Sequence, residues 1–117
     1  MRHRCDTVKL GMKRQHRDSV LANLAKALIL HERVDTTLSR AKAGQRFAER
    51  LVTLARRGDG HARRLVFARL QDKGAVDRLF REVAPRFGDR PGGYTKVVRL
   101  GPRRGDGAEI ARLMFVE

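Results

Sequence analysis

Apolar residues recur at helical spacing through the first half of the chain. Between positions 16 and 31, apolar side chains at 20, 21, 24, 27 and 28 lie on one face of an α-helix. A wider stripe at 47, 48, 51, 52, 54 and 55 predicts a second helix with a broad buried face. The short β-branched segment 34–38 between the two stripes is typical of a strand.

Turn-forming residues divide the chain after this strand. Ser39 is expected to cap the second helix, and Gly58-Asp59-Gly60 to end it. Shorter apolar stripes predict a third helix over 60–71 and a fourth over 75–84, which Pro85 closes. The large apolar residues expected to be buried on these helices are Leu24, Leu28, Phe47, Leu51, Leu65, Val66, Leu79 and Phe80.

The last third of the chain predicts β-structure. Arg90-Pro91-Gly92-Gly93 is a turn, because proline and two glycines disfavour helix. Segments 94–100 and 108–116 are expected to form a hairpin of two strands, with residues 101–107 as its loop. The element order fits an α+β fold, a two-layer α-β-α3-β2 arrangement in which a small three-stranded sheet packs on helices. Residues 1–15 lack apolar periodicity and predict a basic N-terminal arm before a single globular domain, 16–117.

Charge narrows the class of partner. The 117 residues include 27 Lys and Arg against 13 Asp and Glu, which gives a net charge of +14. A positive potential of this size attracts polyanions, nucleic acids above all. The excess is concentrated at two places, because residues 1–17 hold six basic residues and one acid, and so do residues 86–104. These two segments are therefore the expected nucleic-acid contacts.

Several kinds of chemistry find no support in the residues. The single cysteine, Cys5, cannot form an internal disulfide. The histidines are scattered and no Cys-x-x-Cys pair occurs, so neither a metal site nor a cofactor is expected. Ser19 and Ser39 lie near expected helix starts, where capping explains them better than nucleophilic catalysis does. No signal peptide and no apolar run of membrane-spanning length is expected.

Candidate RNA-binding residues come from the two basic segments. Lysine and arginine would contact phosphates, and the two glycines of the turn would let the backbone approach RNA closely. Tyr94 either stacks on a base or begins the strand as a core residue. The candidates are Arg2, His3, Arg4, Lys9, Lys13, Arg14, His16, Arg17, Arg90, Gly92, Gly93, Tyr94, Lys96, Arg103 and Arg104.

Short motifs spread along the whole chain resemble one family. They are Met1-Arg2-His3, Thr36-Thr37-Leu38 with Ala41-Lys42, Leu54-Ala55-Arg56-Arg57-Gly58-Asp59, His61-Ala62-Arg63-Arg64-Leu65, Arg90-Pro91-Gly92-Gly93-Tyr94-Thr95 and Arg104-Gly105-Asp106-Gly107-Ala108. In this order they resemble the bacterial large-subunit ribosomal protein L17 family. The resemblance implies an α-β-α3-β2 fold and a structural, non-enzymatic role without cofactors. It also implies binding to large-subunit ribosomal RNA near the exit of the peptide tunnel. The expected setting is a single copy in the cytoplasmic ribosome, beside other large-subunit proteins and away from membranes.

Two other functions stay open at the level of the residues. The expected helices 60–71 and 75–84, joined by a short turn, allow a helix-turn-helix that binds DNA. The densest charge lies elsewhere, however, in the arm and the hairpin. The other alternative is an enzyme that acts on RNA, for which the sequence offers no constellation of catalytic groups.

Overall fold

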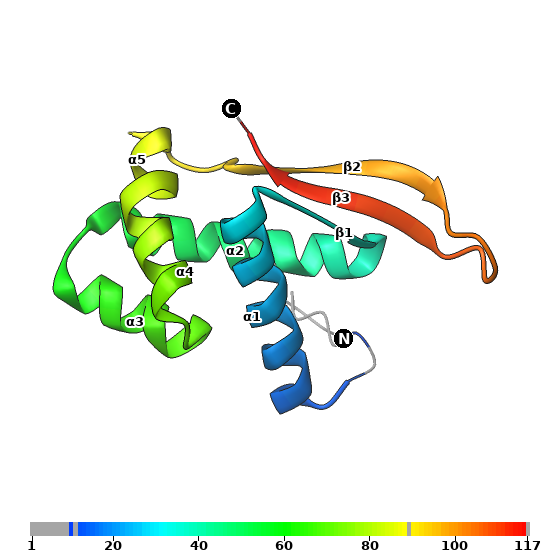
Figure 1. Cartoon of the computed structure of the whole chain (residues 1–117), viewed down its shortest axis with the longest axis horizontal. Helices are drawn as coiled ribbons and strands as arrows, with labels where there is room; N and C mark the ends of the chain where they lie inside the picture. Colours follow the sequence, from blue (N-terminus) through cyan, green and yellow to red (C-terminus); the bar gives the residue numbers. More distant parts are fainter. Residues whose placement is uncertain (1–9, 11, 89, 117) are drawn as a thin grey trace, which may run out of the picture.

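Helices cover one side of a small antiparallel sheet in the computed structural model, which describes residues 10, 12–88 and 90–116 (Figure 1). The elements in chain order are α1 (Arg14–His31), β1 (Arg33–Thr37), α2 (Leu38–Arg57), α3 (Gly60–Leu70), α4 (Lys73–Arg78), the π-helical turn η1 (Leu79–Val83), α5 (Ala84–Phe87), β2 (Thr95–Pro102) and β3 (Glu109–Phe115). Because α4, η1 and α5 follow one another without a break, this order confirms the predicted α+β fold. The division into arm and domain stays a prediction, since nearly all of the arm lies outside the described residues.

The sheet has the order β1-β3-β2, with β3 in the centre. Its register pairs Val34 with Leu113 and Val97 with Leu113, so these three side chains share the face that the helices cover. A β-bulge interrupts the register between Arg99 and Gly101. Gly101 has a φ of 110°, which favours glycine. The strand therefore continues through Pro102, and the predicted hairpin loop 101–107 is wrong at its first two residues.

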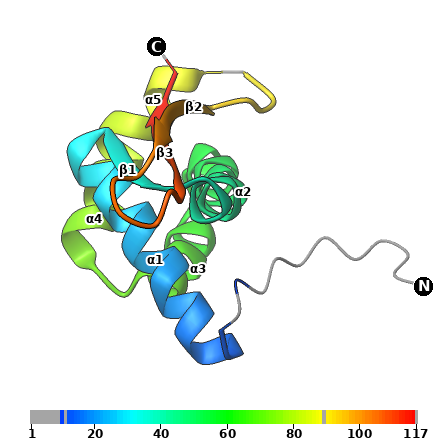
Figure 2. The ribbon, with the colours of Figure 1, turned by 90° about the vertical axis from the view of Figure 1, so that its right-hand side faces the viewer.

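The core lies between the sheet and the helices: α1 and α2 both contact the sheet, and α3, α4 and η1 pack on these two helices. Figure 2 shows α2 end-on, with β2 and β3 towards the top and α1 and α3 below. Ala111 and Leu113 of the central strand are fully buried against the helices. Among the described residues, no helix covers the opposite face of the sheet (Figure 1).

Most of the predicted core residues are buried. Leu28, Leu51, Val66 and Leu79 are at most 2% exposed, whereas Leu24, Phe47 and Phe80 are half-buried. The prediction for Leu65 is wrong, because this side chain is 39% exposed. The buried face of α3 is formed by residues four positions apart, Ala62, Val66 and Leu70, and Leu65 lies about 100° away from Val66 around the helix axis.

Two predicted helix ends are wrong. Ser39 does not cap α2, because β1 runs directly into the helix, with Thr37 as the N-cap and Ser39 already in the first turn. Pro85 does not close the last helix, which continues to Phe87. The π-helical turn before it, in which the Ala84 N–H donates to the Leu79 carbonyl oxygen, widens the backbone where a proline would otherwise crowd the preceding turn.

Gly44 lies in the middle of α2, where the helix faces Leu24 and Leu113. A Cβ at this position would meet the Leu113 Cδ2 atom at 3.4 Å and the Leu24 Cδ1 atom at 3.5 Å, which is ordinary van der Waals contact. We expect Gly44→Ala to raise the free energy of unfolding by about 0.5–1 kcal/mol, because alanine costs less backbone entropy in a helix. Urea unfolding followed by circular dichroism measures the change, and a loss of stability would show that the helix and sheet cannot accept the methyl group.

Candidate nucleic-acid interface

The described candidate residues lie at three separate places on the molecule (Figure 1). One is the N-terminal end of α1, the second is the segment between α5 and β2 with Lys96 at the start of β2, and the third is the loop of the β2–β3 hairpin at the far end of the sheet. The structure therefore does not gather them into a single pocket. Arg2, His3, Arg4 and Lys9 lie outside the described residues.

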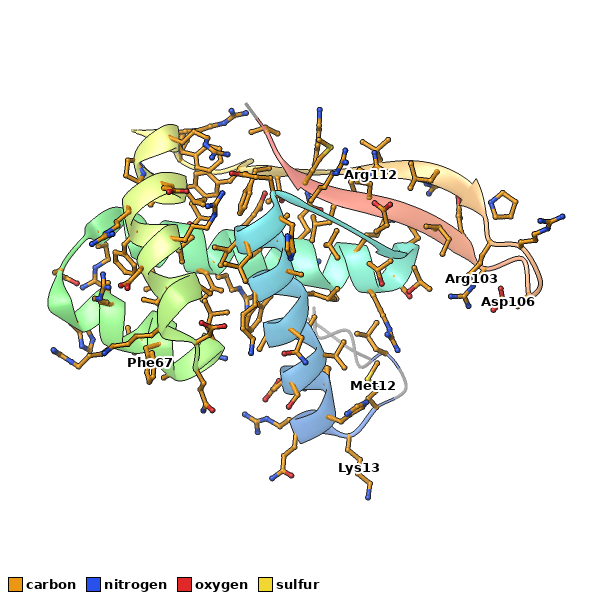
Figure 3. The ribbon with its side chains drawn as sticks, in the orientation of Figure 1. Met12, Lys13, Phe67, Arg103, Asp106 and Arg112 are labelled. Carbon is orange, nitrogen blue, oxygen red and sulfur yellow. The ribbon has the colours of Figure 1, made fainter. Side chains whose placement is uncertain are left out.

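The start of α1 is a positive site, in which the exposed Asp18 of the second turn is the one nearby acid in the helix. Lys13 is the N-cap and makes no side-chain cap hydrogen bond, and the first turn contains no acid. Figure 3 shows Lys13 directed away from the protein body. Arg14 and His16 are exposed and Arg17 is half-buried. A helix N-terminus is itself electropositive, so cations placed there repel it and a phosphate nearby would relieve the repulsion.

The segment between α5 and β2 exposes its backbone to solvent. The Arg90 Nε atom donates to the Gly92 carbonyl oxygen at 3.2 Å, which holds the exposed arginine against the turn. Gly93 has a φ of 66°, a conformation that favours glycine. A Cβ on Gly92 would have no neighbour within 4 Å, so this backbone faces open space.

Tyr94 is a core residue whose ring is not exposed for stacking on a base. The side chain is 0% exposed. Its hydroxyl group donates to the Arg90 carbonyl oxygen at 3.0 Å and accepts from the Arg56 Nη1 atom at 2.8 Å. The ring packs at a tilt on Phe87, with 5.1 Å between centroids. Tyr94 therefore supports the turn from within the core. Of the two roles that the sequence left open, the structure shows that of a core residue beside the strand.

The hairpin contains two arginines with different surroundings. Arg103 pairs with Asp106, and Figure 3 shows the two side chains together at the loop. This hydrogen bond, with a second one from the Ala108 N–H, lowers the pKa of Asp106 to about 2. Arg104 is exposed and forms no such pair with any described residue. Lys96 is also exposed and points to the uncovered face of the sheet. Arg103 thus shapes the loop, while the charges of Arg104 and Lys96 stay available to a ligand.

The acids of the described chain mostly serve the fold. Glu32 accepts from Arg86 and Arg78, and the hydrogen bond from Arg86 is the main reason that the pKa of this carboxyl lies below its usual value. Across the described residues, every Asp and Glu except Asp18 is engaged in an ion pair or a hydrogen bond: Glu32, Asp35, Glu49, Asp59, Asp72, Asp77, Glu82, Asp106 and Glu109. The remaining positive charge is therefore not cancelled locally.

Further exposed cations lie outside the two segments that the sequence singled out. Their side chains form no ion pair or hydrogen bond within the described part of the chain, and they are Arg40, Lys42, Arg64, Arg69, Lys73 and Arg81. Their exposure could have been predicted from the sequence, because each lies off the apolar face of its helix. Net charge per segment hides this signal for the cations of α3 and α4, because acids lie near them in the sequence.

No catalytic arrangement accompanies these cations in the described residues. Ser19 donates to the Gln15 carbonyl oxygen at 3.1 Å within α1, so it is neither a cap nor an activated nucleophile. The described residues also contain no group of three His, Cys, Asp or Glu side chains able to hold a metal ion. Over the same residues, none of the helices has the length and apolar character needed to span a membrane.

Fold and surface together define a small basic α+β protein that presents separated cations on a rigid body. Residues 20–116 match the family model of Ribosomal protein L17. The chain is 53% identical over 116 residues to the large ribosomal subunit protein bL17 of Thermomicrobium roseum, with 99% of each chain covered. It is 49% identical over 108 residues to that of Clostridium novyi, covering 92% of this chain and 96% of the relative. The chain therefore belongs to the ribosomal protein L17 family, as the resemblance predicted.

Membership in this family favours one of the functional classes that the residues left open. A ribosomal protein family is a structural class and not an enzyme class, so the chain is a structural constituent of the large ribosomal subunit. This favours a scaffold in translation over a free-standing DNA-binding module or an RNA-acting enzyme.

Proposed function

We propose that this protein binds and braces large-subunit ribosomal RNA near the exit of the peptide tunnel. It acts as a single copy within the cytoplasmic ribosome, beside neighbouring large-subunit proteins. The observation that carries the proposal is the charge arrangement: all described acids except Asp18 are paired or hydrogen-bonded within the fold, while cations at separated places on the domain form no ion pair with a described acid. Such an arrangement fits several phosphates of a folded RNA at once.

The contacts at each place follow from the local structure. Lys13, Arg14 and Arg17 would bind phosphate at the start of α1, with His16 beside them. Arg90 would bind phosphate where Gly92 and Gly93 let RNA approach the backbone. Lys96 would add a contact at the start of β2 and Arg104 one at the hairpin loop, where Arg103, paired with Asp106, would hold the loop against the RNA, and Arg2, His3, Arg4 and Lys9 would add the arm. Recognition would depend mainly on the shape of the RNA, because phosphate contacts carry no base sequence.

A charge-matched comparison tests this proposal. We expect the triple variant Arg14→Gln, Arg17→Gln and Arg104→Gln to bind purified large-subunit ribosomal RNA more weakly. The slope of log affinity against log salt should fall by roughly one unit for each phosphate that the variant no longer neutralises. Filter binding over a series of salt concentrations measures both quantities.

The control variant removes the same amount of charge from paired positions. Arg57→Gln, Arg99→Gln and Arg112→Gln each remove an arginine that pairs with an acid, namely Asp59, Glu109 and Asp35. An equal reduction of affinity in the two variants would mean that net charge alone drives binding. An unchanged affinity in the first variant would contradict the proposed RNA-binding role of these arginines.

A further inference from the structure

Phe67 stands apart from the other aromatic residues. The chain contains five phenylalanines, one tyrosine and no tryptophan. Tyr94, Phe87 and Phe115 are at most 7% exposed, and Phe47 and Phe80 pack partly buried against the core. Phe67 is 46% exposed, and Figure 3 shows it at the edge of the molecule, on the side away from the sheet. The core of the protein thus makes little use of this ring.

The ring of Phe67 borders a recess of about 450 Å³ between α3 and α4. The recess is lined by Gly60, Arg63, Arg64, Phe67, Lys73 and Val76. Positions 60, 63, 64 and 67 share one face of α3, since they lie three or four residues apart. A Cβ on Gly60 would come within 3.5 Å of the Arg64 Nη1 atom, so the guanidinium group lies over the first turn of the helix.

The cations around this recess differ in availability. Arg63 pairs with Asp77, and its guanidinium group lies 5.2 Å from the centre of the Phe80 ring. These two contacts hold the Arg63 side chain in place at one side of the recess. Arg64 and Lys73 are exposed and have no partner among the described residues. Asp59 pairs with Arg57 and caps α3 by accepting from the Ala62 N–H, and Asp72 caps α4 by accepting from the Ala75 N–H, so neither forms an ion pair with Arg64 or Lys73. The recess therefore combines an apolar aromatic surface with two rim cations, Arg64 and Lys73, that form no ion pair within the described residues.

A nucleotide matches this combination. Its base is a flat ring whose π-face stacks on phenylalanine. Its phosphates are negatively charged and can form ion pairs with Arg64 and Lys73. An apolar side chain of a neighbouring protein would fill the recess but would leave both cations without a counter-charge. We propose that the α3–α4 recess holds an unstacked base of the bound RNA against Phe67, with the adjacent phosphates on Arg64 and Lys73. This inference rests on the proposed function and adds to it a contact with a base.

Affinity measurements with the full chain and purified large-subunit ribosomal RNA test the stacking. We expect Phe67→Leu to weaken binding roughly 5- to 140-fold, the range for removing one base stack, with an unchanged salt slope. Phe67→Tyr should retain wild-type affinity because it keeps the ring. Arg64→Gln should lower the salt slope by about one unit. Leu65→Ala is the matched control, since Leu65 is exposed on the same helix outside the recess.

Photochemical crosslinking locates the contact in assembled large subunits. Irradiation at short ultraviolet wavelength should add a nucleotide to the tryptic peptide of residues 65–69, which mass spectrometry detects. An adduct of this peptide with another protein would overturn the inference, and so would wild-type affinity in Phe67→Leu. If Phe67→Leu binds normally while the Arg14, Arg17 and Arg104 variant fails, only the base contact is refuted. If the wild-type chain does not bind the RNA at all, the proposed function fails as well.

Discussion

Tyr94→Ala is expected to lower the free energy of unfolding by about 3–5 kcal/mol, the range for deleting a fully buried aromatic ring. The ring is 0% exposed and packs on Phe87, so alanine would leave a cavity between α5 and β2. The same change removes the hydroxyl group that links the Arg90 carbonyl oxygen to Arg56. For a chain of this length the melting temperature should fall by roughly 10–20 °C. Thermal and urea unfolding followed by circular dichroism measure the loss.

Two further variants separate the contributions of Tyr94. Tyr94→Phe keeps the ring and removes only the hydroxyl, so it should cost about 1–2 kcal/mol, mainly for the buried groups that lose a partner. Phe67→Leu changes an exposed aromatic side chain and should alter stability by less than about 0.5 kcal/mol. A nearly neutral result for Tyr94→Ala would mean that the ring lies outside the core.

Removal of residues 1–12 is expected to weaken binding to purified large-subunit ribosomal RNA on the order of 100-fold at physiological salt, while the melting temperature stays the same. The truncation removes three cations, Arg2, Arg4 and Lys9, so the salt slope should fall by roughly three units if each binds a phosphate. The truncation should stop before Lys13, because the Lys13 carbonyl oxygen accepts the Arg17 N–H at 2.9 Å in the first turn of α1. Filter binding and thermal unfolding give the two readouts.

A full-length variant distinguishes charge from length. Arg2→Gln, Arg4→Gln and Lys9→Gln together remove the same cations but keep the chain intact. If phosphate binding is the main contribution of the arm, this variant should lose nearly as much affinity as the truncation. Wild-type affinity in both proteins would contradict a role of the arm in RNA binding. A lower melting temperature in the truncated chain would show instead that the arm supports the fold.

Some candidate RNA-binding residues can be recognised from the sequence, and others only from the structure. Dense basic segments identified the start of α1 and the hairpin, because charge per segment is a property of the sequence. Arg103 and Arg104 are adjacent in sequence, yet the first pairs with Asp106 and the second does not, and this follows from the fold of the loop. Arg64 and Lys73 do not stand out in the sequence because nearby acids balance them there, although those acids cap helices or pair elsewhere.

The sequence by itself determined the order of elements, the fold class, the basic character and the family. Periodicity and turn residues act over a few positions, so the chain shows them without its fold. Only the tertiary structure decided the burial of Tyr94, the exposure of Phe67 and Leu65, and the continuation of the last helix through Pro85 to Phe87. Burial depends on segments distant in sequence, as when Phe87 packs on Phe115, whereas the local π-helical turn accommodates Pro85. The physical reason is that burial is set by which surfaces meet, and local sequence leaves that choice open.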